Sequence, residues 1–390
     1  MDPQPARRRR ATRRVMTRRG RAARRAVLAL LAVAVAVAGV SYGQALTAPG
    51  DASWTVRTVE WVRDNGGAGL VDAIENWWYT RSAPTNASPS RSDLPVLGAP
   101  PAAARPAAPT HRTAAPAPTP MAIPPGITAV PGEGRWVPGR VDKNGVPALY
   151  TTFVQPDPAH ASVVAGVAWI RASDTAVHLV PGTAQPGGPS WPGDARVAPR
   201  DVPGLVATFN SGWRFQDLLG GFYEGGRYSH ALEQGAGSVV IDRAGHVSIG
   251  AWGRDVSMSQ DVVAVRQNLH LIVTAGKPAP GIANASGPWG VPGNQRQFTW
   301  RSGLGVDAHG NLIYVAGDHM TLRVLTNALV AARAVRAVEL DMHAGMVFFA
   351  RWVPGRTGAI APEKLLPAMP SRADRFLRPD QRDFFYVTLG

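Results

Sequence analysis

The chain contains no cysteine. This absence excludes disulfide bonds, metal sites built on thiolates and cysteine nucleophiles. A domain of roughly 260 residues buries enough surface to fold without disulfides, so the absence is compatible with a place outside the cytoplasm. The nine histidines form no H-E-x-x-H motif, no G-x-S-x-G segment occurs, and no glycine-rich loop is followed by Lys-Ser or Lys-Thr. We therefore expect no metal site, no serine elbow and no P-loop.

Acidic residues are scarce, with 27 Asp and Glu against 41 Lys and Arg and a formal net charge of +14. The excess is local. Eleven arginines and one aspartate lie in residues 1–25, which gives that segment 11 − 1 = +10 and leaves 14 − 10 = +4 for the rest of the chain. The folded body is therefore not expected to bind nucleic acid. An alternative, in which the basic tail binds nucleic acid, predicts that removal of residues 7–25 abolishes function.

No charged residue occurs in residues 26–48, a run dominated by Ala, Val and Leu. About 20 apolar residues suffice for a helix to cross a bilayer, so we expect a transmembrane signal-anchor here. Arginines before such a helix favour the cytoplasmic side. We thus expect a single-pass protein of the plasma membrane, with residues 1–25 as a cytoplasmic tail and the C-terminal domain extracellular. A cleaved signal peptide, with small residues at 41–45, is the alternative.

Two short amphipathic helices are expected in residues 49–81. Their apolar residues fall near helical spacing, and Asn-Gly-Gly at residues 65–67 separates the two helices. The apolar residues are Trp54, Val59, Trp61, Val62, Leu70, Val71, Ile74, Trp77, Trp78 and Tyr79. The aromatic side chains either lie at the membrane interface or pack on the main domain, and the sequence leaves both arrangements open.

A linker and a folded domain are expected after these helices. Residues 82–126 are rich in Pro, Ala, Ser and Thr without apolar periodicity, which predicts a disordered, extended tether. The folded domain is expected at residues 127–390. Short runs rich in β-branched and aromatic residues at 148–154, 162–170 and 176–180 predict strands near its start.

The domain is predicted to be α+β. Asp-x-x-Gly turns join apolar runs in residues 238–249 and 303–314, and each pattern predicts a β-hairpin with glycine at positive φ. One helix is expected from an N-cap at Thr321 to about Val335, because apolar residues recur at helical spacing, and a buried strand follows at 337–341. We expect a β-rich mixed sheet with hairpins and one covering helix, preceded by a transmembrane helix and a disordered linker.

Polar residues stand where three of these strand-like runs end or begin. Residues 205–212 end in Asn210 and Gly212, a pattern that directs an amide into a cleft and allows close approach of a ligand. A plain turn explains the same two residues. Arg301 precedes the second hairpin and carries a planar fork of donors that suits the oxygens of a phosphodiester. A surface arginine without a ligand is the alternative there.

Two carboxylates form the third candidate group. Glu339 and Asp341 are two positions apart on the expected strand, so their side chains should face the same side. Two carboxylates in one cleft commonly cleave glycosidic bonds, one as acid and the other as base or nucleophile, and we predict both as catalytic. A structural ion pair with an arginine is the alternative.

The motifs in these three stretches, and their order, resemble those of the phosphodiester glycosidase family. The resemblance spans roughly residues 140–352. Asn210 and Gly212 match an Asn-Gly-Gly-Phe-like segment of that family, with serine in place of its first glycine. Arg301 begins a match to an Arg-Thr-Ala-Leu-Gly-like segment, in which leucine and the final glycine also agree. The family's Asn-Leu-Asp-Gly-Gly-Gly-Ser segment corresponds to residues 339–345, where Leu and Asp341 match and Glu-Leu-Asp-Met-His-Ala-Gly is present.

The resemblance implies hydrolysis of a sugar-1-phosphodiester, in a cell-envelope glycan or glycoconjugate. Arg301 would hold the phosphodiester, Asn210 beside Gly212 would orient the sugar or phosphate, and Asp341 with Glu339 would supply acid and base. His343 stands where the family has glycine and is the expected substitute as donor or acid. The alternative is a degenerate, non-catalytic member that binds a cell-envelope glycopolymer or serves as an envelope scaffold. No cofactor is assigned from the sequence.

Overall fold

The structure is a computed structural model that describes residues 18–95, 117–186, 191–218, 220–284, 287–355 and 358–390. The chain divides into two compact units, Met1–Ala48 and Pro49–Gly390. Most of the expected basic tail, residues 1–17, and the middle of the expected linker, residues 96–116, lie outside the described residues.

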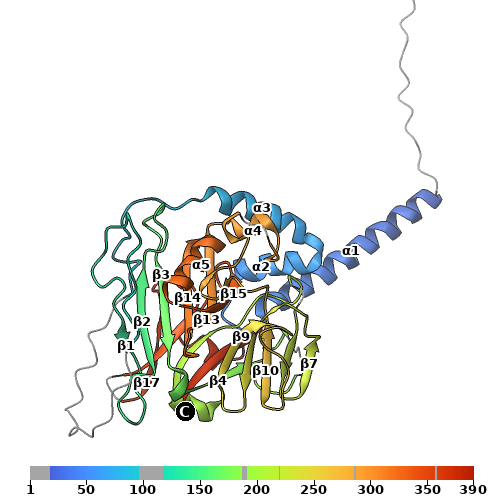
Figure 1. The fold of residues 1–390 in the computed structure, drawn as a ribbon. Coiled ribbons are helices and arrows are strands. Elements are labelled where there is room, and N and C mark those ends of the chain that lie inside the picture. The colour runs from blue at the N-terminus through green and yellow to red at the C-terminus, as the bar shows by residue number, and fades with distance from the viewer. Residues whose placement is uncertain (1–17, 96–116, 187–190, 219, 285–286, 356–357) are drawn as a thin grey trace, which may run out of the picture. The chain divides into compact units, whose positions relative to one another are not determined.

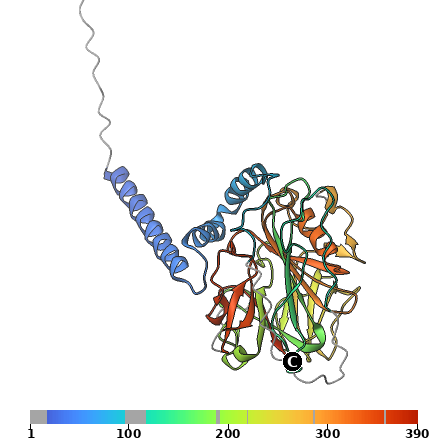
Figure 2. The same ribbon diagram turned by 90° about the vertical axis from the view of Figure 1, so that its left-hand side faces the viewer.

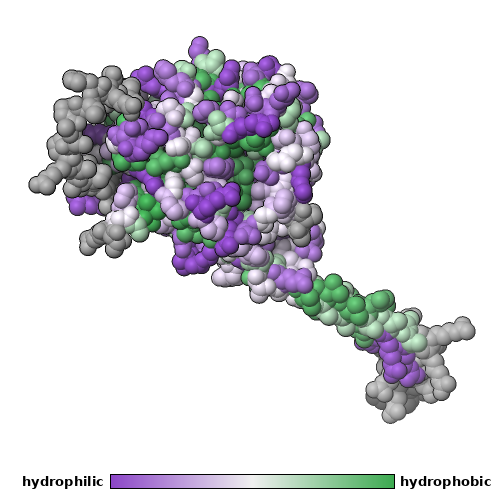
Figure 3. Space-filling model, turned by 90° about the horizontal axis from the view of Figure 1, so that it is seen from below, coloured by the Kyte–Doolittle hydropathy of each residue, from purple (hydrophilic) through white to green (hydrophobic). Residues whose placement is uncertain are grey.

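The first unit contains helix α1 (Arg18–Thr47). Its segment Arg21–Thr47 is the one helix, in the described part of the chain, that is long and apolar enough to cross a membrane. Leu30 is 70% exposed and Val35 is 71% exposed, so the first unit itself does not bury these apolar side chains. The space-filling view shows this helix with apolar side chains along most of its surface (Figure 3). These properties fit a signal-anchor.

The second unit begins with a pair of helices, α2 (Trp54–Val62) and α3 (Ala68–Arg81), which we call the α2–α3 hairpin (Figure 1). The N–H of Val56 donates to the Ser53 side chain over 3.3 Å and caps α2. A kink at Arg63–Gly67 joins the helices, and Gly66 there has a φ of +89°. Glycine adopts this conformation without steric cost, which is why the Asn-Gly-Gly segment separates two helices as expected.

The folded unit extends on both sides of the expected linker. The Thr85 carbonyl accepts a hydrogen bond from the N–H of Ser162. Met121 is buried, and its N–H donates to the carbonyl of Gly134. The compact unit that begins at Pro49 includes these segments, since they hydrogen bond to residues after position 127.

Three sheets make up the body of the second unit. The largest has eight strands in the spatial order β1 (Val137–Pro138), β2 (Leu149–Val154), β3 (Ala165–Ile170), β14 (Leu312–Met320), β13 (Thr299–Val306), β15 (Arg336–Met342), β11 (Val273–Thr274) and β12 (Lys277–Pro278). The second has the order β7 (Arg227–His230), β6 (Phe222–Glu224), β10 (Val262–Gln267), β8 (Gly237–Asp242) and β9 (Val247–Ala251). The third has the order β17 (Ile360–Lys364), β16 (Phe349–Pro354), β5 (Leu205–Asn210), β18 (Phe384–Leu389) and β4 (Thr175–Val180).

The α+β class and both expected hairpins, β8–β9 and β13–β14, are confirmed. Every ladder between the named strands is antiparallel, so the sheets do not mix parallel and antiparallel strands. The largest hydrophobic core takes side chains from all three sheets, for example Phe153, Phe209 and Ile241. Short helical turns at Ala172–Asp174, Pro199–Gly204, Ile282–Asn284 and Arg375–Leu377, and helix α4 (Pro292–Gln295), lie in the connections.

Helix α5 (Leu322–Ala331) covers β13 and β14, as Figure 1 and the turned view in Figure 2 show. The N–H of Val324 donates to the Thr321 side chain, which confirms the expected N-cap. The helix lies close to β13 because Gly303 has no side chain: a Cβ there would stand 2.8 Å from a Leu329 methyl group. It ends before the expected Val335, since Arg333 adopts a φ of +70°, which a right-handed helix does not accommodate.

Candidate functional site

A cavity of about 560 Å³ lies where β15 ends and where the chain turns away from β5. One side of it belongs to the α2–α3 hairpin and the other to the sheet-bearing body. Its lining consists of Thr55, Val56, Val59, Glu60, Arg63, Asp72, Glu75, Tyr79, Trp213, Arg214, Asp217, Gly290, Val291, Asn294, Asp341, Met342, His343, Ala344, Met346 and Arg382. Of the six residues predicted for the site, only Asp341 and His343 are in this lining.

Asp341 occupies the end of β15, where the backbone leaves the sheet. Its side chain is only 9% exposed. One carboxylate oxygen accepts a hydrogen bond from the N–H of Met342 over 2.8 Å, and the other accepts from Nη2 of Arg382 over 2.9 Å. Burial raises the pKa of Asp341 from 3.8 to about 7, although the nearby Arg382 guanidinium lowers it. Near neutral pH this carboxyl group can therefore both accept and release a proton.

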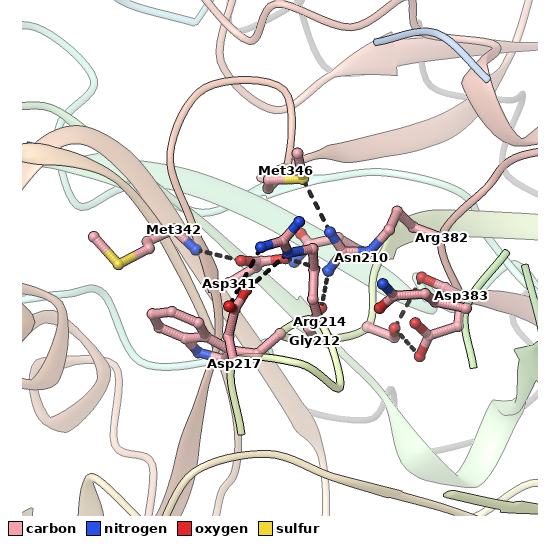
Figure 4. A network of polar contacts seen from close by, with 12 residues as sticks. Asn210, Gly212, Arg214, Asp217, Asp341, Met342, Met346, Arg382 and Asp383 are labelled. Carbon is pink, nitrogen blue, oxygen red and sulfur yellow. Dashed lines mark hydrogen bonds and ion pairs between the residues drawn. The ribbon is translucent and has the colours of Figure 1, made fainter. Parts of the chain in front are cut away.

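Arg382 connects several parts of the site (Figure 4). Besides Asp341, its Nη2 donates to the carbonyl of Gly212 over 2.8 Å. Its Nη1 contacts the sulfur of Met346 over 3.3 Å and lies 3.7 Å from the carboxylate of Glu60 on α2. This arginine is part of the cavity lining and pairs with a carboxylate of the body and with one of α2.

Arg214 and Asp217 form the neighbouring charged pair. Nε of Arg214 donates to Asp217 over 2.8 Å, and its Nη1 donates to Asp64 of the α2–α3 hairpin over 3.3 Å. The negative charge of Asp217 is one of the causes that raise the pKa of Asp341. Asp217, which shares the cavity with Asp341, is thus the second carboxylate of the body at this site.

His343 follows Asp341 in a tight turn and adopts a φ of +74°, a left-handed conformation that glycine adopts without steric cost. Its Nδ1 lies 3.2 Å from the hydroxyl of Thr299, and its Nε2 lies 3.5 Å from the carboxylate of Glu75. Burial, with the charges of Arg301 and Arg63, lowers the pKa of His343 to about 3. The imidazole is therefore neutral at physiological pH and can donate one hydrogen bond.

The α2–α3 hairpin brings carboxylates to the arginines of the body. Glu60 faces Arg382 and Asp64 faces Arg214. On the same hairpin, Arg63 pairs with Asp72 over 2.6 Å and with Glu75. The positive charges of the cavity are thus all paired with carboxylates in this arrangement.

Arg301 and Glu339 lie beneath the cavity and do not line it. Their side chains, each 1% exposed, form an ion pair. Arg301 also donates to the carbonyls of Met320 and Asn294. The structure therefore places the predicted phosphate-binding arginine and one predicted catalytic carboxylate in a buried pair, as in the structural alternative considered from the sequence.

The strand register explains why Glu339 and Asp341 do not act on one cleft. Ser302 of β13 pairs with Asp341, whereas the next residue, Gly303, pairs with Glu339. This irregularity lets one residue of β13 span two of β15, and bulges of this kind redirect side chains. The two carboxylates consequently meet different arginines.

Asn210 is also buried and has its hydrogen bonds satisfied by the protein. Its Nδ2 donates to the hydroxyl of Ser302 over 3.0 Å. Its Oδ1 accepts from the hydroxyl of Tyr314 over 3.0 Å and from the N–H of Phe348 over 3.1 Å. This amide holds three strands or strand ends together and is not part of the cavity wall.

The segment after Asn210 supports the site indirectly. A Cβ at Gly212 would stand 2.2 Å from Oδ1 of Asn268, so no side chain fits there, and the carbonyl of Gly212 accepts a hydrogen bond from Arg382. Ser211 donates to the side chain and carbonyl of Asp383. Gly212 is therefore a positioning residue for Arg382.

Sequence reasoning missed Arg214, Asp217 and Arg382. Arg214 and Asp217 follow the Asn210 stretch closely, which is a signal that could have been used. Arg382 lies 41 residues after Asp341, in a segment with several charged residues and no motif. Among the described residues, no three His, Asp or Glu side chains are grouped as a metal site requires.

Comparisons with known proteins find similarity only to solved structures, at low identity. No protein-family model matches the chain, and no curated protein matches it. The chain is similar to the solved catalytic domain of zebrafish N-acetylglucosamine-1-phosphodiester alpha-N-acetylglucosaminidase, auto-inhibited by its pro-peptide, with 16% identity and a TM-score of 0.40 over 64% of this chain and 86% of that chain.

Two further solved structures are similar to this chain. A hypothetical protein from Synechocystis has 14% identity and a TM-score of 0.37 over 58% of this chain and 59% of that chain. A putative exported protein from Burkholderia pseudomallei has 12% identity and a TM-score of 0.29 over 58% of this chain and 74% of that chain. These similarities assign neither a function nor a residue role to this chain.

Proposed function

We propose that the chain is a hydrolase that cleaves a sugar-1-phosphodiester of a cell-envelope glycan or glycoconjugate. In this proposal α1 anchors the chain in the plasma membrane, and the second unit lies outside the cell. The observation that carries the proposal is the position of Asp341: a carboxyl group with a pKa of about 7 lies on a cavity wall beside Arg382. A carboxyl group of this kind suits proton transfer at neutral pH.

The reaction requires one proton to be removed from the attacking water molecule. Water attacks C1 of the sugar, the C1–O bond breaks, and the phosphate leaves with the electron pair of that bond. Asp341 in its carboxylate form accepts the proton that the attacking water loses. The products are a free sugar and a phosphate monoester. Asp217, whose negative charge helps to raise the pKa of Asp341, takes the role of second carboxylate that was expected of Glu339.

The phosphodiester is held by the arginines of the cavity. Arg382 and Arg214 take the role that the sequence predicted for Arg301, because their guanidinium groups line the cavity whereas Arg301 lies beneath it. Both arginines already face carboxylates of the α2–α3 hairpin, Glu60 and Asp64. Binding of an anionic phosphodiester therefore requires these two carboxylates to move away or to be displaced.

A non-catalytic binding protein for a cell-envelope glycopolymer is the second candidate function. The observation in its favour is that the arginines of the cavity are all paired with carboxylates, which leaves no free positive charge for a phosphate. In this case the cavity would bind neutral sugar units through the aromatic and carboxylate side chains of its walls.

Release of free sugar from nucleotide sugars tests the proposal. The full chain is purified in detergent and incubated with these phosphodiesters, and the reducing sugar is measured for the wild type and for Asp341→Asn. We expect release by the wild type and a loss of about 100-fold or more in the variant, the usual effect of removing a positioned acid–base group.

Asp261→Asn is the matched control, because its side chain is 81% exposed and is not in the cavity lining. It should release sugar at the wild-type rate. If the wild type releases no sugar but retains glycan in equilibrium dialysis, the hydrolase is contradicted and the glycan-binding protein is supported.

A further inference from the structure

The α2–α3 hairpin exposes an apolar face. On α3, Leu70, Ile74, Trp77 and Trp78 recur at helical spacing, and Trp54 begins α2. Their exposed fractions are 65% for Leu70, 56% for Ile74, 56% for Trp77, 58% for Trp78 and 70% for Trp54. We call these five residues the outer face. Single exposed apolar residues are common, but four within nine positions of α3, with the rings of Trp77 and Trp78 6.2 Å apart, indicate a partner.

The other side of α3 is the side that packs on the body. Asp72, Glu75 and Tyr79 line the cavity, and Val71 is buried. A usual surface helix directs its apolar stripe toward the core and its charged residues toward water. Helix α3 does the opposite. The fold leaves the outer face unused, so its composition is not explained by packing within the chain.

We infer that the outer face lies in the interface of a lipid bilayer. Tryptophan is enriched at the membrane–water boundary, where its ring is partly buried and its N–H stays hydrated. Amphipathic helices bind there by inserting leucine, isoleucine and tryptophan side chains below the headgroups. Arg81 at the end of α3 stands 5.3 Å from the ring of Trp77, where its guanidinium can meet an anionic headgroup.

Chain length supports a bilayer over other partners. α1 ends at Thr47 and α2 begins at Trp54, so only seven peptide steps separate the two helices. At most about 25 Å can be spanned by so few residues. If α1 crosses the membrane, as the proposed anchor requires, the start of α2 cannot leave the neighbourhood of the bilayer surface. The outer face is then an apolar surface that the short connection to α1 holds near the lipid.

Insertion of the outer face into the interface would also fix the position of the cavity relative to the membrane. The cavity lies on the opposite side of α3 from Leu70 and Ile74. With the outer face in the interface, the hairpin is fixed beside the membrane and the cavity opens in the layer next to it. The site would then act on material close to the membrane surface.

The absence of cysteine makes a direct test available. Single-cysteine variants Leu70→Cys and Ile74→Cys of the full chain are labelled with a nitroxide and reconstituted in vesicles of phosphatidylethanolamine and phosphatidylglycerol. Collisions of the label with oxygen, which concentrates in lipid, and with a water-soluble nickel complex are measured by electron paramagnetic resonance. Tyr228→Cys is the aqueous reference, because Tyr228 is 56% exposed on β7. Val33→Cys reports on α1.

We expect the labels at Leu70 and Ile74 to favour oxygen and the label at Tyr228 to favour nickel. Aqueous behaviour at Leu70 and Ile74 would overturn the inference, and Val33 in lipid would then show that the anchor itself stands. Shielding of both labels from both reagents, or spin–spin broadening at high dilution of protein in lipid, would overturn it in favour of a protein partner or a second copy. Lipid contact at Leu70 and Ile74 with Val33 in water would support docking without the anchor.

Discussion

Arg382 and Asp341 meet at the cavity wall through a hydrogen bond of 2.9 Å, and the same nitrogen of Arg382 also donates to the carbonyl of Gly212. The guanidinium is thereby held in place from two sides. Its positive charge opposes the effect of burial on Asp341, whose pKa is about 7 in its presence. The pKa of the proposed base therefore reflects two opposing effects: burial raises it, and the charge of Arg382 lowers it.

Arg382→Met should raise the pKa of Asp341 further, because the buried carboxylate loses the charge that stabilises it. If Asp341 is the base, release of sugar rises with pH through about 7 in the wild type. The rise should occur at higher pH in the variant. Arg378→Met is the control, since Arg378 is 63% exposed and pairs with Asp374 instead. An unchanged midpoint in Arg382→Met would contradict this assignment.

Asp341 should also make stability depend on pH. Its pKa is higher in the folded state, about 7, than its ordinary value of 3.8. Between these values the folded chain keeps a proton that the unfolded chain releases, so the free energy of unfolding falls as pH rises, by up to about 1.4 kcal/mol per pH unit. The loss is complete above pH 7.

Urea unfolding of the wild type and Asp341→Asn from pH 4 to 8 measures this effect. The difference between the two should change between pH 4 and 7 and then stay constant, because asparagine does not titrate. A difference that is the same at every pH would show that burial does not raise the pKa of Asp341.

Arg301→Met should destabilise the fold by about 3–5 kcal/mol, because it leaves Glu339 buried without its partner. Arg301→Met combined with Glu339→Leu should recover part of the lost stability. The recovery is incomplete because the carbonyls of Met320 and Asn294 still lack the hydrogen bonds that Arg301 donates. Arg372→Met, in a pair that is 59% and 29% exposed, should cost less than about 1 kcal/mol. Unfolding in urea measures all three. A normal stability with an increased KM for Arg301→Met would instead indicate that Arg301 binds substrate.

Local patterns predicted the elements whose partners are near in the sequence. The two hairpins follow from Asp-x-x-Gly turns, and α5 follows from its spacing and from Thr321. The third sheet was not predictable in this way, because β5 lies between β16 and β18, whose residues are more than a hundred positions away. Pairing at such distances depends on the whole fold and leaves no local signal.

The candidate site was predictable only in part for a similar reason. Strand alternation correctly brings Asp341 to the end of β15, but the register irregularity opposite Ser302 and Gly303 separates it from Glu339. Nothing in the residues next to Arg301 shows that its guanidinium will be buried and will donate to Met320, Glu339 and Asn294. Charged residues that match a motif can therefore be structural, and only their burial distinguishes the two roles.

His343 should be strained by its φ of +74°. A side chain with a Cβ pays about 1–2 kcal/mol in this conformation, whereas glycine does not. His343→Gly should therefore be more stable than His343→Ala by about 1 kcal/mol, although glycine usually destabilises a fold relative to alanine. Both variants lose the imidazole, so their comparison in urea isolates the backbone. Greater stability of the alanine variant would mean that the turn relaxes to negative φ.

Neutralising the hairpin carboxylates that face the arginines should strengthen binding of a phosphodiester. Glu60→Gln with Asp64→Asn frees Arg382 and Arg214 from competing charges at 3.7 and 3.3 Å. The carboxylates of these pairs are 22% and 53% exposed. Ion pairs in contact with solvent contribute about 0.2–1 kcal/mol each, so the Kd for a nucleotide sugar should fall by up to about fivefold for each pair.

Isothermal titration calorimetry with the Asp341→Asn background, which prevents turnover, measures this change in Kd. Asp72→Asn is the control on the same hairpin, because Asp72 pairs with Arg63 and faces neither Arg214 nor Arg382. It removes one negative charge from the cavity, so any general effect of net charge appears there as well. A gain of affinity confined to Glu60→Gln with Asp64→Asn would assign the phosphate to Arg382 and Arg214. The same gain per removed charge in both variants would show that the phosphate responds only to the total charge of the cavity, and weaker binding would place it elsewhere.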